Sequence, residues 1–105
     1  MIFQLDNSNK KGILTFDEAL TIENISVAKE LFMEAFEKTD FVTIQFNHVE
    51  QIDLSGIQLF CSAFKTFSET NKILTIGDKA QALTLQKKAK QIGLKFNMDQ
   101  PRNES

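Results

Sequence analysis

The chain has 105 residues, the length of a single domain, and is too short to contain two independent hydrophobic cores. Hydrophobic residues make up 42% and charged residues 25%, which is typical of a globular protein and excludes the disordered and fibrous classes. The net charge of −2 and the ten phenylalanines, with no tyrosine or tryptophan, argue against nucleic-acid binding, because phosphates need a basic surface and phenylalanines are expected in the core.

The cysteine content and the N-terminal residues bear on the cellular location. Cys61 is the only cysteine and cannot form a disulfide within the chain, which fits a reducing compartment. The N-terminal residues alternate between apolar and polar, with neither a basic segment nor an apolar run long enough for export. We therefore expect a cytoplasmic protein that does not insert into a membrane.

The first part of the chain is predicted to form an antiparallel hairpin followed by a helix. Residues 2–5 and 13–16 are short apolar runs, and the polar segment 6–12 between them is typical of a turn. From residue 24 onward, apolar side chains recur every three or four positions, which indicates a helix that ends near Asp40.

A strand and a second helix are predicted next. Residues 41–46 alternate and are rich in β-branched side chains, which favours a strand, and a polar loop over 47–54 follows. The helix after this loop should end near Asn71, a residue type that tolerates the left-handed conformation. Its predicted apolar face comprises Ile57, Phe60, Cys61, Phe64 and Phe67.

The last third is predicted to contain a strand, a third helix and a tail. Residues 73–76 form the strand, Asp78 caps the helix and Gly93 ends it. Residues 94–96 are predicted as a last edge strand, and 98–105 as a polar tail. The inward residues of the third helix are expected to be Ala82, Leu85, Ala89 and Ile92.

This order of elements predicts an α/β fold. Strands that alternate with helices favour a small, mixed, mostly parallel sheet of four to five strands, with the helices packed mainly on one face. The prediction places a single domain over residues 1–97. We expect it to be a monomer or a weak homodimer.

The most informative segment is residues 52–59, which joins the polar loop to the second helix. Ser55 stands at the N-terminal edge of that helix, where its side chain could accept a hydrogen bond from free backbone N–H groups. Gly56 beside it lacks a side chain that would crowd an approaching partner. On these grounds alone, the pair is interpreted as a helix cap.

The segment also resembles a known family. Asp53, Leu54, Ser55 and Gly56 are similar to the Asp-Ser-Ser-Gly-Leu signature of the STAS family, named after sulphate transporters and anti-sigma factor antagonists. The order of elements agrees over nearly the whole chain. In the antagonists, the serine before the glycine is phosphorylated by a partner kinase, which implies Ser55 as the phosphorylation site. The implied partner-binding residues are Asp53, Leu54, Ser55, Gly56 and Ile57.

The resemblance also implies the partners. For an antagonist-like regulator of transcription, these are an anti-sigma factor or serine protein kinase of the histidine-kinase-like ATPase type, and a serine phosphatase. The sequence departs from the family pattern in two places. Leu54 replaces a hydroxyl residue, and the first-loop pattern Gly-Glu-Leu-Asp appears as Glu18, Ala19, Leu20 and Thr21, without its glycine and its acidic residue. The alternative is therefore a constitutive STAS adaptor subunit of a chemotaxis or lipid-transport complex, in which Ser55 only caps a helix.

Catalysis has little support in the sequence. Ser55 lacks a Gly-x-Ser-x-Gly motif, and a triad of His48, Asp53 and Ser55 is the remaining catalytic alternative. His48 and Cys61 lack the spacing of zinc ligands, and Glu50 with Asp53 is interpreted as a solvated loop. The four glycines do not cluster, as a phosphate-binding loop requires. We expect no catalytic residue, cofactor or metal.

Overall fold

Among the residues that the structure describes, four strands form one sheet, in the order in which they occur in the chain. The computed structural model describes residues 1–6, 8–47, 49 and 51–94. The strands of the sheet are β1 (Ile2–Asp6), β2 (Lys11–Phe16), β3 (Phe41–Phe46) and β4 (Ile73–Ile76). β1 pairs antiparallel with β2, whereas β2, β3 and β4 are parallel, so the predicted mixed, mostly parallel sheet is confirmed.

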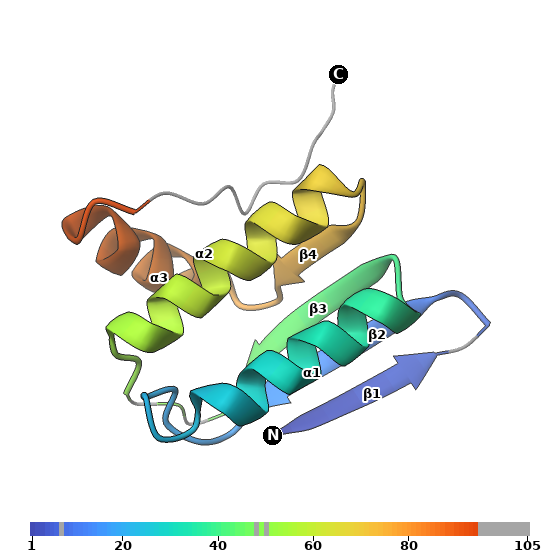
Figure 1. Cartoon of the computed structure of the whole chain (residues 1–105), viewed down its shortest axis with the longest axis horizontal. Helices are drawn as coiled ribbons and strands as arrows, with labels where there is room; N and C mark the ends of the chain where they lie inside the picture. Colours follow the sequence, from blue (N-terminus) through green and yellow to red (C-terminus); the bar gives the residue numbers. More distant parts are fainter. Residues whose placement is uncertain (7, 48, 50, 95–105) are drawn as a thin grey trace.

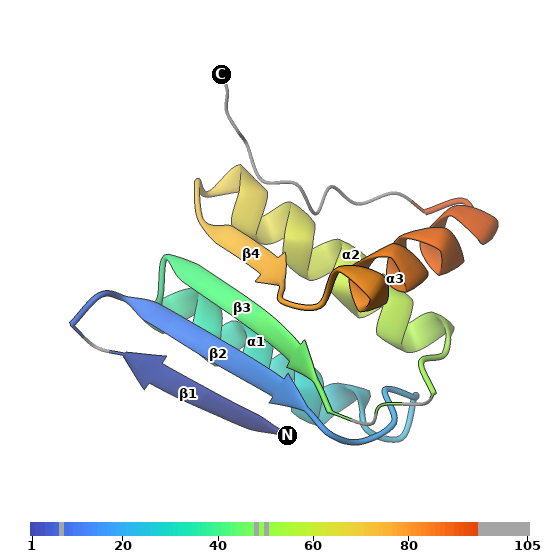
Figure 2. The same cartoon turned by 180° about the vertical axis from the view of Figure 1, so that it is seen from behind.

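The described part of the chain also contains three helices: α1 (Ile25–Lys38), α2 (Leu54–Glu69) and α3 (Lys79–Gln91). α1 and α2 lie side by side over one face of the sheet (Figure 1), and the view from behind shows the strands in front of them (Figure 2). α3 packs against α2 and β4. The prediction that the helices pack mainly on one face is thus confirmed.

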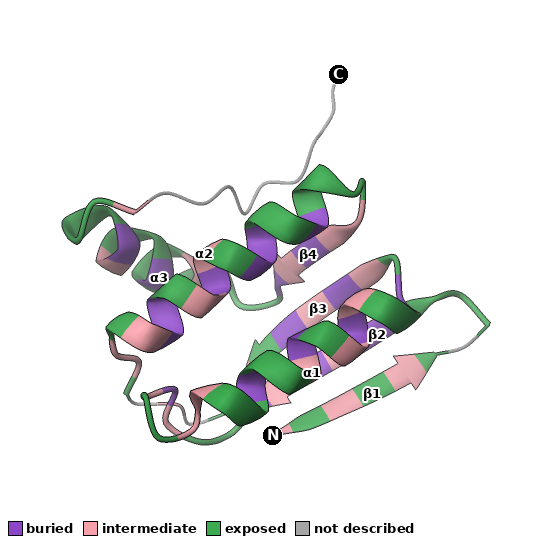
Figure 3. Cartoon of the chain, viewed as in Figure 1, coloured by how far each residue is buried: buried purple, intermediate pink, exposed green. Residues whose placement is uncertain are grey.

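The core fills the space between the sheet and the two covering helices. Alternate strand residues point into this space, and the buried positions follow the inner sides of the helices (Figure 3). Phe60 and Phe64 are fully buried, as predicted from their periodicity. The ring of Phe60 packs edge-on against those of Phe16 and Phe32, with centroids 5.8 and 5.5 Å away. Aromatic packing therefore joins β2, α1 and α2.

The signals predicted for the two ends of α3 are confirmed, but one prediction about its inward face is wrong. Asp78 caps α3 through the N–H groups of Ala80 and Gln81, and Gly93 has a φ of 82°. Ile92, predicted to point inward, is 46% exposed, so this prediction is wrong. The reason is that the helix ends at Gln91 and leaves Ile92 as its C-cap.

The predicted last strand cannot be followed over its length. Leu94 is not part of a strand, and the rest of 94–96, together with the tail 98–105, lies outside the described residues. Within the described part of the chain, no helix combines the length and the apolar character needed to cross a membrane.

Candidate functional site

Two loops meet at the edge of the sheet where β2 and β3 end: the first loop, residues 17–24, which follows β2, and the loop that leads from β3 to α2. Because these strands are parallel, the chain leaves both at the same edge. Leu20 and Ile52 form a parallel bridge there. The Leu20 N–H donates to the Gln51 carbonyl oxygen at 2.8 Å, and the Asp53 N–H donates to the Leu20 carbonyl oxygen at 3.1 Å. The predicted motif is therefore held in place by the first loop.

Asp53 caps α2 and joins it to the first loop. One carboxylate oxygen accepts from the Gly56 N–H at 3.2 Å, and the other accepts from the Ile22 N–H at 3.0 Å. The interpretation of Ser55 as the cap is therefore wrong. An aspartate three residues before Gly56 occupies the preferred capping position, and Ser55 is the second residue of the helix.

Gly56 has an internal role rather than the one expected from the sequence. A Cβ atom at this position would lie 2.6 Å from the Leu20 carbonyl oxygen and 2.8 Å from Ile52 Cγ2. Glycine therefore permits the first loop to cross the start of α2, and it does not clear space for a partner. Ile57 is only 5% exposed, so its side chain also lies beneath the surface.

The exposed part of the site is apolar. Leu54 is 53% exposed, and Ile22, whose N–H is bound by Asp53, is 67% exposed. Ser55 follows Leu54 and is partly exposed. We call Ile22, Leu54 and Ser55 the switch surface. Ile22 was missed by the sequence reasoning, because its contact with the motif spans 31 residues.

The start of α2 already holds the carboxylate of its N-cap Asp53, and it has two further backbone N–H groups that can bind an acceptor. Its first turn contains no acidic residue, and the backbone N–H groups of Leu54 and Ser55 make no hydrogen bond within the described part of the chain. Free N–H groups and the positive end of the helix dipole attract anions. The Ser55 hydroxyl likewise makes no hydrogen bond to a described residue. Among the described residues, no hydrogen bond therefore depends on that hydroxyl.

The catalytic and metal alternatives gain no support from this geometry. His48 and Glu50 lie outside the described residues, and both carboxylate oxygens of Asp53 accept from backbone N–H groups. In the described ranges, no group of three or more potential ligands could hold a metal ion. Burial raises the pKa of the Cys61 thiol, which agrees with a packing role for this side chain.

Comparison with known proteins identifies the family. Searches of curated proteins and of solved structures give no significant match. A family model described as the STAS domain matches residues 3–76, which run from β1 through β4 and include the linked loops. Since this match covers more than half of the 105 residues, the chain belongs to the STAS domain family.

Proposed function

We propose that this chain is a phosphorylation-controlled protein-interaction domain, similar to the anti-sigma factor antagonists, that binds its partner when Ser55 is unphosphorylated. Membership of the STAS domain family supports a regulatory, protein-binding role. The observation that carries the proposal is the position of Ser55. Its hydroxyl has no hydrogen-bond partner in the described chain, and it lies beside exposed Leu54 in the first turn of α2.

Phosphorylation would act through charge at this surface. A phosphate adds roughly −1.5 to −2 charges and three acceptor oxygens. The N–H groups of Leu54 and Ser55, which have no partner among the described residues, and the helix dipole can bind it, whereas the carboxylate of Asp53 opposes the added charge. A partner that packs on the apolar switch surface would then face a desolvated dianion. If the phosphate costs about 3 kcal/mol of binding free energy, the affinity for the partner falls roughly a hundredfold.

The partners follow from the family resemblance. They are an anti-sigma factor or serine protein kinase of the histidine-kinase-like ATPase type, which would phosphorylate Ser55, and a serine phosphatase, which would remove the phosphate. In this proposal the chain has no catalytic activity of its own, acts in the cytoplasm as a regulator of transcription, and is a monomer or weak homodimer.

The alternative function, a constitutive adaptor, is based on Leu54 and Thr21, two residues that differ from the family pattern. Asp53 rather than Ser55 provides the helix cap, so the adaptor no longer needs Ser55 for that purpose. An adaptor would bind through Ile22 and Leu54 irrespective of the charge at position 55. The two functions therefore differ in one measurable property, the charge sensitivity of binding.

The test is a pull-down from the native host with wild type, Ser55→Asp and Ser68→Asp, followed by identification of the bound proteins by mass spectrometry. Ser68 is exposed near the other end of α2 and serves as the matched control. We expect an ATPase-type kinase bound to wild type and Ser68→Asp but depleted from Ser55→Asp. Equal recovery of every partner by all three proteins would support the fixed adaptor instead.

A further inference from the structure

The outer side of α3 differs from the rest of the chain in its charge. The helix carries four lysines and no acidic residue, although the whole chain has a net charge of −2. Lys79, Leu83, Lys87 and Lys90 are spaced by four, four and three residues, so they follow one side of the helix over about 17 Å. All four residues are exposed, on the side of α3 that faces away from the core (Figure 3). We call them the α3 stripe.

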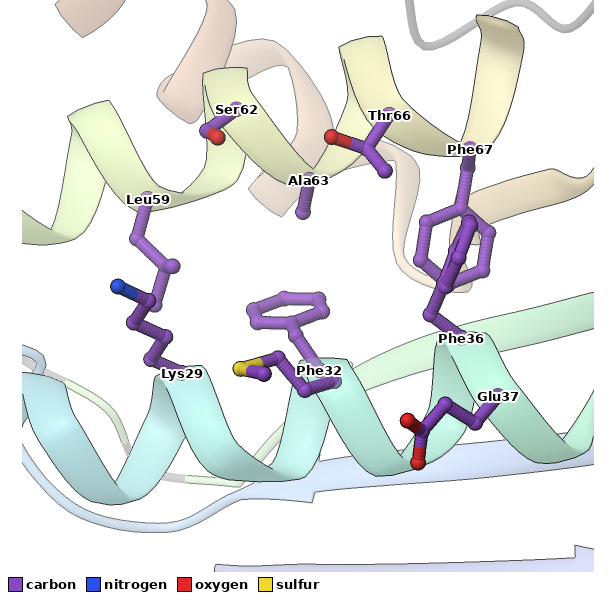
Figure 4. Close-up of a pocket in the computed structure, with 10 residues that line it drawn as sticks. Lys29, Phe32, Phe36, Glu37, Leu59, Ser62, Ala63, Thr66 and Phe67 are labelled. Carbon is purple, nitrogen blue, oxygen red and sulfur yellow. The ribbon is translucent and has the colours of Figure 1, made fainter. Parts of the chain in front are cut away.

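The three lysines of the α3 stripe form no ion pair with a described residue. Charges on α1 are instead mixed. The hollow between α1 and α2 is lined by Lys29 and Glu37 (Figure 4), and Lys38 pairs with Glu34 at 2.8 Å. Charges of both signs are typical of a helix side that simply faces water. The α3 stripe, with charge of one sign only, departs from this arrangement.

Helix stability does not explain the lysines of the α3 stripe. Positive charge is favourable near the C-terminus of a helix, where Lys90 lies, but Lys79 is the first residue of α3, at the positive end of the helix dipole. Lys87 and Lys90 are three residues apart and repel each other, and α3 has no acidic residue to offset this repulsion. The lysines are therefore explained better by a negative charge outside the chain.

We propose that the α3 stripe docks on the anionic surface of a membrane, without insertion of the helix. Charge complementarity selects an anionic partner. The charges of the stripe are all lysines, which are depleted in protein interfaces, whereas α3 has none of the arginine and aromatic residues that such interfaces prefer. A lysine acts as a point charge and suits lipid phosphates, which impose no fixed geometry. Leu83, 58% exposed within the stripe, can enter the headgroup region, an apolar contact that a nucleic-acid backbone does not offer.

The proposed membrane contact is separate from the proposed switch. The α3 stripe lies on α3, which packs against α2 and β4, whereas Ser55 belongs to the first turn of α2. α2 also lies between α3 and α1 (Figure 1). Binding to lipid needs neither a kinase nor a partner protein. Failure of one proposal therefore leaves the other untouched.

The test is co-sedimentation of the full chain with lipid vesicles. Vesicles of phosphatidylcholine alone are compared with vesicles of an equal mixture of phosphatidylcholine and phosphatidylglycerol. A lysine near an anionic membrane surface contributes about 1 kcal/mol, or roughly fivefold in affinity, so three lysines should give about a hundredfold preference for the anionic vesicles. The preference should fall as salt is added, because the screening length shortens from about 30 Å at 0.01 M to about 8 Å at 0.15 M ionic strength.

Variants separate the α3 stripe from the net charge of the chain. The double variant Lys87→Gln and Lys90→Gln should weaken binding to anionic vesicles about 20- to 30-fold. The matched double variant Lys29→Gln and Lys38→Gln removes the same charge from α1 and should weaken binding less than about twofold at 0.15 M ionic strength. Leu83→Ala should weaken binding about two- to fivefold, since it removes only the apolar contact. All of these side chains are exposed, so the variants should fold, which thermal unfolding checks.

Three results would overturn the proposal. One is the absence of a preference for anionic over neutral vesicles. Another is an equal loss of binding in the two double variants, because the net charge rather than the α3 stripe would then determine binding. The third is a wild-type chain that binds an acidic protein through Lys87 and Lys90 but does not bind anionic vesicles, because the stripe would then be a protein interface.

Discussion

The carbonyl oxygen of Leu20 lies 2.6 Å from the point that a Cβ atom on Gly56 would occupy. Gly56→Ala should therefore push the first loop away from α2. We expect a loss of about 1–3 kcal/mol in the free energy of unfolding, the usual range for overpacking. The better helix propensity of alanine, worth about 1 kcal/mol, offsets only part of this cost. Urea denaturation measures the difference.

Gly77→Ala is the matched control for this prediction. A Cβ atom at Gly77 would be 3.4 Å from Thr43 Cγ2, which is an ordinary van der Waals contact. Its effect should stay within about 0.5 kcal/mol. Equal losses in the two variants would contradict a special role for the contact between Leu20 and Gly56.

The second prediction concerns the two hydrogen bonds of the Asp53 carboxylate. Asp53→Ala removes the cap of α2 and also the link to Ile22, so we expect a loss of about 1–3 kcal/mol in unfolding free energy. Asp53→Asn should lose less, because asparagine is a comparable cap. Asp78→Ala, which removes only the cap of α3, should cost about 0.5–2 kcal/mol. An Ile22 amide signal that does not move in Asp53→Ala would contradict the link.

Local periodicity was sufficient to predict most of the fold. Apolar alternation predicted β3, and the spacing of residues such as Phe60 and Phe64 predicted the inward face of α2. These patterns depend on neighbours within one element. The similarity to the family signature around Ser55 could be found from the sequence for the same reason, because the residues of the signature are contiguous.

Contacts between distant segments could not be predicted in this way. The hydrogen bond from Ile22 to Asp53 depends on the parallel register of β2 and β3, which no local pattern specifies. Without that contact, Gly56 was interpreted as space for a partner. The N-cap of α2, in contrast, is a local feature. Asp53 stands three residues before Gly56, the preferred spacing for a cap, so its capping role could have been predicted from the sequence alone.

The third prediction tests the core. Phe60 is fully buried and contacts the rings of Phe16, Phe32 and Phe46, so Phe60→Ala should cost about 3–5 kcal/mol in unfolding free energy. Leu83→Ala on the exposed side of α3 is the control, and it should change stability by less than about 1 kcal/mol. A loss at Phe60 as small as that at Leu83 would mean that the aromatic cluster does not hold the helices to the sheet.

The fourth prediction concerns the pH dependence of Cys61. Burial raises the pKa of its thiol in the folded state, because desolvation disfavours the thiolate. This shift contributes fully to the free energy of unfolding at a pH below the thiol pKa of the unfolded chain. The contribution is lost as the pH rises through the thiol pKa of the folded protein. The reaction of Cys61 with an aromatic disulfide reagent should therefore have a higher pH midpoint in the native protein than in urea. Identical midpoints would contradict the burial of the sulfur.

The last prediction separates stability from signalling at Ser55. Because Asp53 is the cap, Ser55→Ala should change the free energy of unfolding by less than about 0.5 kcal/mol, while phosphorylation by the cognate kinase is abolished. Ser55→Asp should weaken partner binding, although a carboxylate has less charge and fewer acceptor oxygens than a phosphate and mimics it only in part.

Ser62 and Ser68 provide the controls for this prediction, because both lie beyond the first turn of α2, where the helix dipole has little effect. Mass spectrometry of protein isolated from its host should find phosphate on Ser55 and on neither control. If phosphate occurs only at other sites, and Ser55→Asp binds every partner as wild type does, the switch hypothesis fails. The exposed pair Ile22 and Leu54 would then mark the contact of a fixed adaptor, since their exposure does not depend on the chemistry of Ser55.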